Sequence, residues 1–182
     1  SIRSPADAVA HGIALITEDR KGEGLLLTQS ISANIALGNM PEISRGGVVN
    51  PSAETALAQR QIDAMRIRSS SPTQLVGELS GGNQQKVVIG RWLERECSVL
   101  MFDEPTRGID VGAKFDIYAL LGDLTRQGKA LVVVSSDLRE LMLICDRIGV
   151  LSAGRLVETF ERDSWTQDDL LAAAFAGYQK RD

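Results

Sequence analysis

The sequence is poor in the residues that most often cross-link a small fold or bind metals. Its 182 residues contain one histidine, two cysteines and 4% aromatic residues. Cys97 and Cys145 are too few to form a disulfide framework. Both lie among apolar residues, so we expect reduced cysteines that pack in the interior. His11 is expected at a helix end or on the surface. No metal cluster and no nucleophile–base pair is visible.

Long apolar runs and an excess of positive charge are also missing. The longest runs, such as 130–134, are far shorter than the ~20 residues that span a bilayer. Residues 1–5 contain no hydrophobic signal core. A net charge of −4 gives no basic field for nucleic acid. With 43% hydrophobic and 24% charged residues, the chain is ordinary for one soluble domain with a core. We expect it in the cytosol or at the cytosolic face of a membrane, without a nucleic-acid partner.

The expected elements follow the order strand, helical insertion, α/β core. Continuous apolar runs between helices favour parallel strands that are covered on both faces. Helices are expected at 5–11, 30–37, 51–65, 83–95, 111–126, 137–145 and from 166 onward. Ser30, Asn50, Asp110 and Asp137 are expected to cap the helices that follow them, and 166–169 (TQDD) resembles a capping box. Strands are expected at 13–17, 99–102 and 130–135, with a hairpin at 147–152 and 155–159. We expect a charged loop at 18–24 and a mobile connection at Gly46-Gly47.

Two adjacent carboxylates, Asp103 and Glu104, end the apolar strand at 99–102. Ligands of open α/β sheets bind at the carboxyl ends of strands. An aspartate there can hold Mg²⁺ directly or through water, and the neighbouring carboxylate can polarise an attacking water. The alternative is a solvated acidic pair at a strand end.

A second candidate site precedes the helix at 83–95. Ser80 offers a hydroxyl, Gly81 and Gly82 let a ligand approach the backbone, and the helix directs free N–H groups toward it. These features suit a phosphate oxygen. A plain helix N-cap is the alternative, and it becomes weaker when Gln84, Gln85, Lys86 and the Asp-Glu pair about twenty residues later are considered together.

These segments together resemble ATP-binding-cassette (ABC) ATPases. Residues 79–86 (LSGGNQQK) resemble their signature motif, and 100–106 (LMFDEPT) resemble the Walker B strand. Residues 108–110 (GID) resemble the D-loop, and 133–137 (VVSSD) occupy the place of the switch, or H-loop. The resemblance implies a partial P-loop NTPase fold of the α/β class, with a mainly parallel sheet, an inserted helical subdomain and a C-terminal hairpin plus helix.

The resemblance also implies ATP and Mg²⁺ as cofactors. It assigns catalytic positions to Glu104, Asp110, Glu18 and Ser136, and the magnesium, through water, to Asp103. The expected nucleotide contacts are Ser80, Gly81, Gly82, Asn83 and Gln84.

A finer resemblance is to the second cassette of bacterial tandem-cassette sugar importers of the ribose, galactose and xylose type. Residues 16–21 (ITEDRK), the NQQK form of the signature and 105–114 (PTRGIDVGAK) carry it. It implies three partners: the first cassette, a transmembrane permease and, indirectly, a periplasmic sugar-binding protein. It also implies a place on the cytoplasmic face of the inner membrane. The helical insertion and the loop at 18–24 would then face the permease, although a solvated loop is the alternative.

Three departures from the cassette pattern bear on mechanism. No G-x-x-x-x-G-K-[ST] phosphate loop occurs in the 182 residues. The Q-loop glutamine position holds Glu18, and the H-loop histidine position holds Ser136. We therefore expect a fragment that begins inside a cassette and is inactive alone. Its signature would complete the ATP site of the other cassette in trans.

The expected organisation is one partial cassette over 1–182: 1–29 the core strand and Q-loop region, 30–78 the helical subdomain, 79–160 the motif-bearing core, and 161–182 the last helix. Two alternatives stay open. One is a non-transport cassette ATPase, which the acidic balance and short insertion disfavour. The other is an inactive structural fragment that self-associates.

Overall fold

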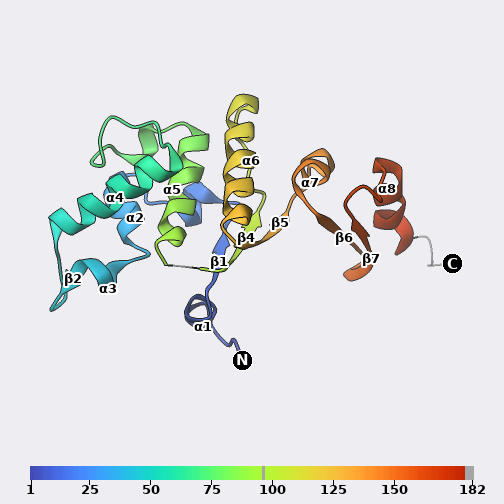
Figure 1. Ribbon diagram of the computed structural model, residues 1–182, viewed down its shortest axis with the longest axis horizontal. Helices are drawn as coiled ribbons and strands as arrows, with labels where there is room; N and C mark the ends of the chain where they lie inside the picture. Colours follow the sequence, from blue (N-terminus) through green and yellow to red (C-terminus); the bar gives the residue numbers. More distant parts are fainter. Residues whose placement is uncertain (96, 179–182) are drawn as a thin grey trace. The chain divides into compact units, whose positions relative to one another are not determined.

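The computed structural model describes residues 1–95 and 97–178, and it divides into two compact units, Ser1–Val134 and Ser135–Asp182 (Figure 1). The predicted α/β class is confirmed by the order of the elements in the chain. The boundary between the units follows the last strand of the first unit. It falls inside the range 79–160 that the sequence assigns to a single core.

A three-stranded parallel sheet forms the centre of the first unit. Its order is β1 (Ile13–Ile16), β4 (Val99–Asp103) and β5 (Ala130–Val134). Leu15 pairs with Met101, and Met101 pairs with Val132. Helix α5 (Gly81–Leu93) packs against β1, and α6 (Val111–Arg126) packs against β5 and against α5.

The prediction of strands covered on both faces is wrong for the described chain. Side chains alternate across the pleat, and alternate residues of β1 and β4 are buried, including Ile16, Leu100 and Phe102. On the opposite face of the sheet, the paired residues Leu15, Met101 and Val132 are 57%, 39% and 47% exposed. The apolar runs therefore predicted strands correctly but not the cover on their second face.

The helical insertion is built from α2 (Ile31–Ala36), α3 (Met40–Ile43) and α4 (Pro51–Met65), and the 3₁₀ helix η2 (Val76–Glu78) follows it. The predicted caps are confirmed at Ser30, whose side chain accepts from the Ala33 N–H, and at Asn50, which caps α4 ahead of Pro51.

The predicted mobile connection at Gly46-Gly47 is instead a hairpin turn. It joins the short strands β2 (Ser44–Arg45) and β3 (Val48–Val49). Both glycines have positive φ, 59° and 80°, which a two-residue hairpin turn of this hand requires.

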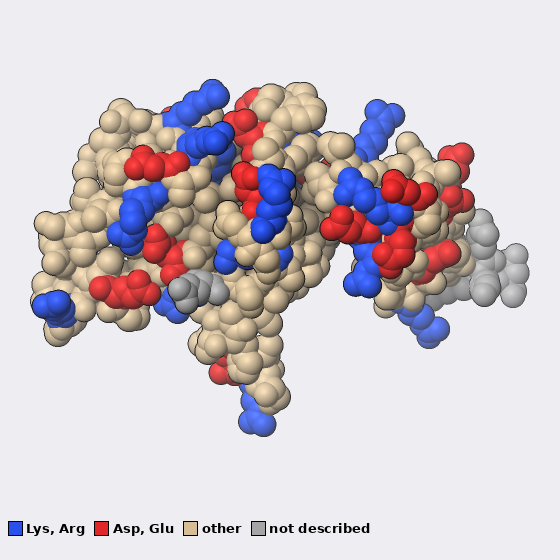
Figure 2. Space-filling view, viewed as in Figure 1, with Lys and Arg blue, Asp and Glu red and all other residues tan. Residues whose placement is uncertain are grey.

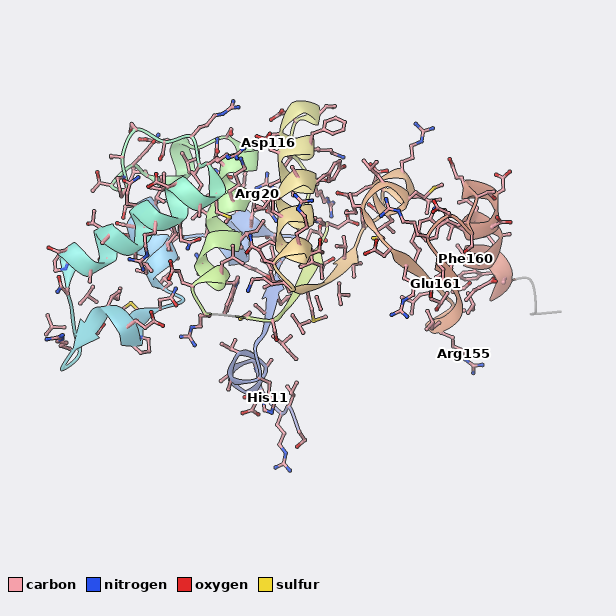
Figure 3. The ribbon with its side chains drawn as sticks, viewed as in Figure 1. His11, Arg20, Asp116, Arg155, Phe160 and Glu161 are labelled. Carbon is pink, nitrogen blue, oxygen red and sulfur yellow. The ribbon has the colours of Figure 1, made fainter. Side chains whose placement is uncertain are left out.

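The charged segment after β1 is a short helix rather than the expected loop. Residues Arg20–Gly24 form a π-helix, η1, in which Arg20 and Gly24 are buried. Upstream, helix α1 (Pro5–Ala10) is capped by Ser4 and ends at His11, as predicted for that histidine. Figure 3 shows His11 at the end of α1, away from Arg20.

The second unit contains α7 (Leu138–Ile144), the hairpin of β6 (Arg147–Ser152) and β7 (Arg155–Glu161), and α8 (Gln167–Ala176). Its core is the cluster Ile148, Val150, Leu170 and Ala173, with Trp165 packed against it. The capping box predicted in front of α8 is confirmed between Thr166 and Asp169.

Both cysteines are free, as predicted, although only Cys97 is fully buried and Cys145 is half-buried. Burial is the main cause that raises the pKa of each thiol, which keeps both protonated and unreactive near neutral pH. Among the described residues, no helix is both long and apolar enough to cross a bilayer.

Candidate functional site

The acidic pair lies at the carboxyl end of the central strand, as the sequence predicts. Asp103 is the last residue of β4 and pairs with Val134 of β5. The backbone N–H of Glu104 donates to the Val134 carbonyl at 2.8 Å, and Glu104 has a φ of +46°. A left-handed conformation is uncommon outside glycine and is found more often where a side chain must be aimed at a ligand. The turn thus directs Glu104 away from the path of its strand.

The signature segment begins α5 with an exposed serine. Ser80 is the N-cap residue, but its side chain caps no backbone N–H. Its hydroxyl oxygen instead accepts from Asn83 Nδ2 at 2.9 Å. The plain N-cap alternative is therefore wrong for the Ser80 side chain. The first-turn N–H groups and the positive end of this 13-residue helix remain directed toward the same surface as Ser80.

The two glycines of the signature have a packing role that the sequence did not predict. A Cβ on Gly81 would lie 2.8 Å from Arg20 Nη2 and 3.1 Å from the Gly108 carbonyl oxygen. A Cβ on Gly82 would lie 2.8 Å from the Cβ of Ala113 on α6. The glycines thus let α5 approach both the 107–110 segment and α6, apart from any approach of a ligand.

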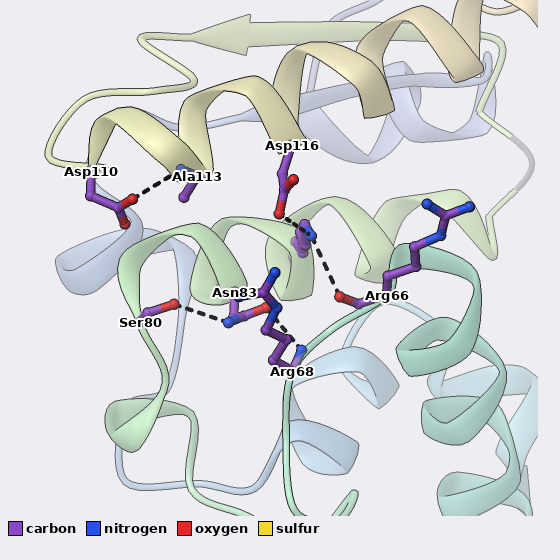
Figure 4. A network of polar contacts seen from close by, with 8 residues as sticks. Arg66, Arg68, Ser80, Asn83, Asp110, Ala113 and Asp116 are labelled. Atoms are coloured by element: carbon purple, nitrogen blue, oxygen red, sulfur yellow. Dashed lines mark hydrogen bonds and ion pairs between the residues drawn. The ribbon is translucent and has the colours of Figure 1, made fainter.

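A polar network joins α5 to the end of the helical insertion and to α6 (Figure 4). Asn83 Oδ1 accepts from the Arg68 backbone N–H at 2.9 Å. The buried Lys86 Nζ lies 3.4 Å from the Arg66 carbonyl oxygen and 3.4 Å from Asp116 Oδ2. The signature helix is therefore connected at successive turns to residues that follow α4.

Gln84, a predicted nucleotide contact, lies on the inner side of α5. It is 4% exposed, and its Nε2 donates to the Val76 carbonyl of η2 at 3.2 Å. Its side chain is therefore not presented at the surface with Ser80. The structure brings together Ser80, Gly81, Gly82 and Asn83 at the start of α5 and leaves the Gln84 amide in the interior.

Asp110 starts α6, where its side chain accepts from the Ala113 N–H at 2.9 Å. The residues before Asp110 are bound by a side chain from a distant segment. Arg20 donates to the Arg107 carbonyl at 2.7 Å and to the Gly108 carbonyl at 3.1 Å. Arg107 also forms an ion pair with Glu18, the residue at the Q-loop position. Glu18 thus faces a cation of the 107–110 segment.

Arg20 has a role that its place in the sequence did not predict. It stood inside a charged run that resembled a solvated loop, and charged runs are usually solvated. Arg20 appeared only as part of the segment 16–21 that carries the finer family resemblance, and no role was assigned to it.

Ser136, the last predicted catalytic residue, belongs to the second unit. It is exposed and follows the end of β5 by two residues. Its neighbour Ser135 donates to Glu140 at 2.6 Å and accepts from the Asp137 N–H at 3.1 Å. These contacts build the tight turn that leads to α7, where Asp137 is the N-cap, as predicted.

The residues of the first unit fit part of a magnesium–phosphate site. Mg²⁺ is commonly held by one or two carboxylates together with phosphate oxygens. Asp103 and Glu104 offer such carboxylates at the sheet edge, whereas no group of three metal-binding side chains occurs in the described ranges. A metal here would depend on the phosphates of a nucleotide to complete its ligands.

Comparison with known proteins identifies the family. A protein-family model described as "ABC transporter" matches residues 5–107. The chain belongs to this family. It is 47% identical over 173 residues to a ribose import ATP-binding protein of Rubrobacter xylanophilus, covering 95% of this chain and 34% of that protein. It is 45% identical over 179 residues to a putative ribose/galactose/methyl galactoside import ATP-binding protein of Agrobacterium fabrum, covering 98% of this chain and 35% of that protein. The chain thus spans about a third of the length of these relatives.

Solved cassettes share the fold at low sequence identity. A nucleotide-free ATP-binding cassette from an ABC transporter superposes with a TM-score of 0.75 and 19% identity, covering 97% of this chain and 72% of the other. A dimeric ATP-binding cassette in a post-hydrolysis state, bound to ADP and Pi, gives a TM-score of 0.70 and 19% identity, covering 90% and 69%. These likenesses establish the ABC cassette fold and extend no function to this chain.

Proposed function

We propose that this segment works within an ATP-hydrolysing subunit of a bacterial sugar importer. Its relatives are named as ribose or ribose/galactose/methyl galactoside import ATP-binding proteins, and the similarity extends over 95% or more of this chain. The partners would be another cassette, a transmembrane permease and, through the permease, a periplasmic sugar-binding protein. The subunit would lie against the cytoplasmic face of the inner membrane.

The observation that carries the mechanistic part of the proposal is the exposed start of α5. Ser80 is a surface hydroxyl that caps nothing, and the N–H groups of the first turn accompany it. Such an end binds phosphate oxygens. These phosphate oxygens would belong to an ATP molecule bound between two cassettes, as the resemblance to tandem-cassette ATPases implies. The signature would therefore close on ATP that another cassette holds.

The site built by this cassette's own acidic pair would be the weaker one. Asp103 would hold Mg²⁺ through water, Glu104 would polarise the attacking water, and Asp110 would reach across the cassette interface. However, a carboxylate at Glu18 repels phosphate where an amide would not, and Glu18 is already paired with Arg107. A serine at position 136 cannot supply the charge of a histidine.

We propose that only part of the charged segment at 18–24 contacts the permease. Arg20 and Gly24 are buried, whereas Lys21, Gly22 and Glu23 are exposed at the surface of η1. Figure 2 shows basic and acidic side chains interspersed on the drawn face of the first unit, rather than a field of one sign. Contact with a permease would accordingly rest on individual side chains such as Lys21 and Glu23.

Substitutions in the native subunit, assembled with its membrane partners, test this function. Ser80→Arg fills the start of α5 with a bulky side chain and should abolish sugar transport. Glu104→Gln removes one carboxylate charge with little change of shape and should leave more transport than Ser80→Arg does. Arg126→Met, a surface change at the end of α6, is the matched control and should be neutral. Loss of transport with Glu104→Gln but not with Ser80→Arg would overturn the proposed trans role.

A further inference from the structure

Arg20 connects three segments of the first unit that are far apart in the sequence. It begins η1 directly behind β1, and its side chain lies in the interior, where only 8% of the residue is exposed (Figure 3). Nη1 donates to the carbonyl of Arg107 at 2.7 Å, and Nη2 donates to the carbonyl of Gly108 at 3.1 Å. One planar guanidinium therefore binds two consecutive carbonyls that follow the Walker B strand.

The third segment is the start of the signature helix. Arg20 Nη2 lies 2.8 Å from the place where a Cβ of Gly81 would be, and 3.6 Å from that of Gly108. Gly108 also has a φ of +66°, which favours glycine. The guanidinium thus fills space that two glycines leave open, between the turn that leads to Asp110 and the turn that begins with Ser80.

Burying the Arg20 guanidinium costs folding free energy, which indicates that its position serves a purpose other than stability. Removing a charged guanidinium from water is costly, and here its hydrogen-bond acceptors are neutral carbonyls rather than a carboxylate. Nε of Arg20 has no hydrogen-bond partner in the described part of the chain. Burial lowers the pKa of the Arg20 guanidinium, yet arginine stays protonated in proteins. The nearby carboxylate of Glu18 is engaged by Arg107 at the surface.

We propose that Arg20 is a positioning residue that fixes the 107–110 segment against the first turn of α5. Its guanidinium is buried against backbone carbonyls, so we assign it no direct contact with the nucleotide. By holding the Arg107 and Gly108 carbonyls, it keeps the start of α6 and the start of α5 in one arrangement, so that Asp110 and Ser80 meet the partner cassette's nucleotide together. This inference rests on the proposed function, because it names what aligns the surface that the signature presents in trans.

Arginine is required here because of its shape as well as its charge. Its fork presents parallel N–H groups to two acceptors, whereas the lysine ammonium is a single point on a flexible chain. Arg20→Lys keeps the charge and should hold one carbonyl only. Arg20→Met keeps the aliphatic length and should hold neither. The two variants therefore separate the contribution of the guanidinium hydrogen bonds from that of the aliphatic part of the side chain.

The test uses the native subunit, assembled with its partners, and two readouts. Amide hydrogen exchange at residues 107–110 should rise in Arg20→Met, rise less in Arg20→Lys and stay unchanged in Arg126→Met. In ATP hydrolysis, kcat should fall about tenfold or more in Arg20→Met, because displacement of about 1 Å at a reacting site can cost up to 10²-fold. KM for ATP should change less than kcat, and Arg20→Lys should recover part of kcat.

A structural role alone predicts a different pattern. Ile35→Val, a change in the buried part of α2, supplies a variant that loses stability without touching the 107–110 segment. If Arg20→Met loses no more kcat than Ile35→Val, or if exchange at 107–110 is unchanged, the positioning role is overturned. If exchange rises and kcat falls in Arg20→Met while Ser80→Arg remains fully active, the trans function fails but the positioning of 107–110 is supported.

Discussion

The two units hold their polar residues in different ways. In the first unit, polar contacts around the signature helix join residues far apart in the sequence: Arg20 with Gly108, Asn83 with Arg68, and Lys86 with Asp116. In the second unit, the contacts that cap α7 and α8 are local, as between Ser135 and Glu140 or Thr166 and Asp169. The buried Ser152 is the exception, because its hydroxyl joins β6 to the Ala174 carbonyl and the Gly177 N–H at the end of α8. A substitution at one of these first-unit residues should therefore disturb several elements, whereas one at the caps of α7 or α8 should disturb a single turn.

Each unit carries one tryptophan that can report on this difference. Trp92 lies on α5, and Trp165 packs against the core of the second unit. Replacing the other tryptophan by phenylalanine gives a chain with a single reporter. Unfolding followed at Trp92 and at Trp165 then measures the two units separately.

The largest effect is expected at Lys86. Lys86→Ala removes a stem that is buried to the ammonium and leaves the Arg66 carbonyl without its donor. We expect a loss of about 2–4 kcal/mol in the free energy of unfolding at Trp92, comparable to other large-to-small changes in cores. Lys86→Met keeps the stem and should lose less than about 1.5 kcal/mol. Equal losses in the two variants would mean that the ammonium, rather than the stem, carries the stability.

A matched pair of helix caps sharpens the comparison. Asp110 and Asp137 each cap a helix with their own carboxylate. Asp110→Ala and Asp137→Ala should each cost about 1 kcal/mol of stability, measured at Trp92 and Trp165 respectively. Only Asp110→Ala should also reduce ATP hydrolysis by the assembled transporter beyond its effect on stability. An equal reduction by Asp137→Ala would remove the functional distinction between the two caps.

The smallest effect is expected from acid at the start of α8. Hydrogen bonds from the Thr166 side chain and backbone lower the pKa of Asp169. Because the folded pKa is depressed, the stabilisation is complete above the ordinary carboxyl pKa and is lost as pH falls through the folded value. The protection factor of the Asp169 amide, which corrects for the intrinsic pH dependence of exchange, should therefore fall at low pH, and Thr166→Ala should flatten this dependence. An unchanged pH dependence in Thr166→Ala would contradict the assignment to the capping box.

The features that were predictable from the sequence were the local ones. The caps at Ser30, Asn50, Asp110 and Thr166 depend on a side chain two or three residues from the N–H that it accepts from, so a short stretch of sequence contains all the information. The apolar strands and the Asp-Glu pair at the sheet edge are similar cases.

The features that were missed depend on distant partners. The π-helix begun by Arg20 forms around carbonyls that are 87 and 88 residues away, and nothing near position 20 reveals them. The glycines of the signature were explained by ligand approach alone, because their neighbours Arg20 and Ala113 come from other segments. The exposed sheet face was missed for a related reason. An apolar strand sequence indicates that both faces can be buried, but it does not show whether other segments of the described chain cover them.

The central claim is that the signature beginning at Ser80 acts on ATP held by the other cassette. The most direct test is nucleotide trapping with a photoreactive ATP analogue in the assembled transporter, followed by identification of the labelled cassette. The account predicts that Ser80→Arg abolishes trapping at the other cassette, whereas Glu104→Gln leaves that trapping in place. Trapping at the other cassette that persists in Ser80→Arg and disappears in Glu104→Gln would contradict it.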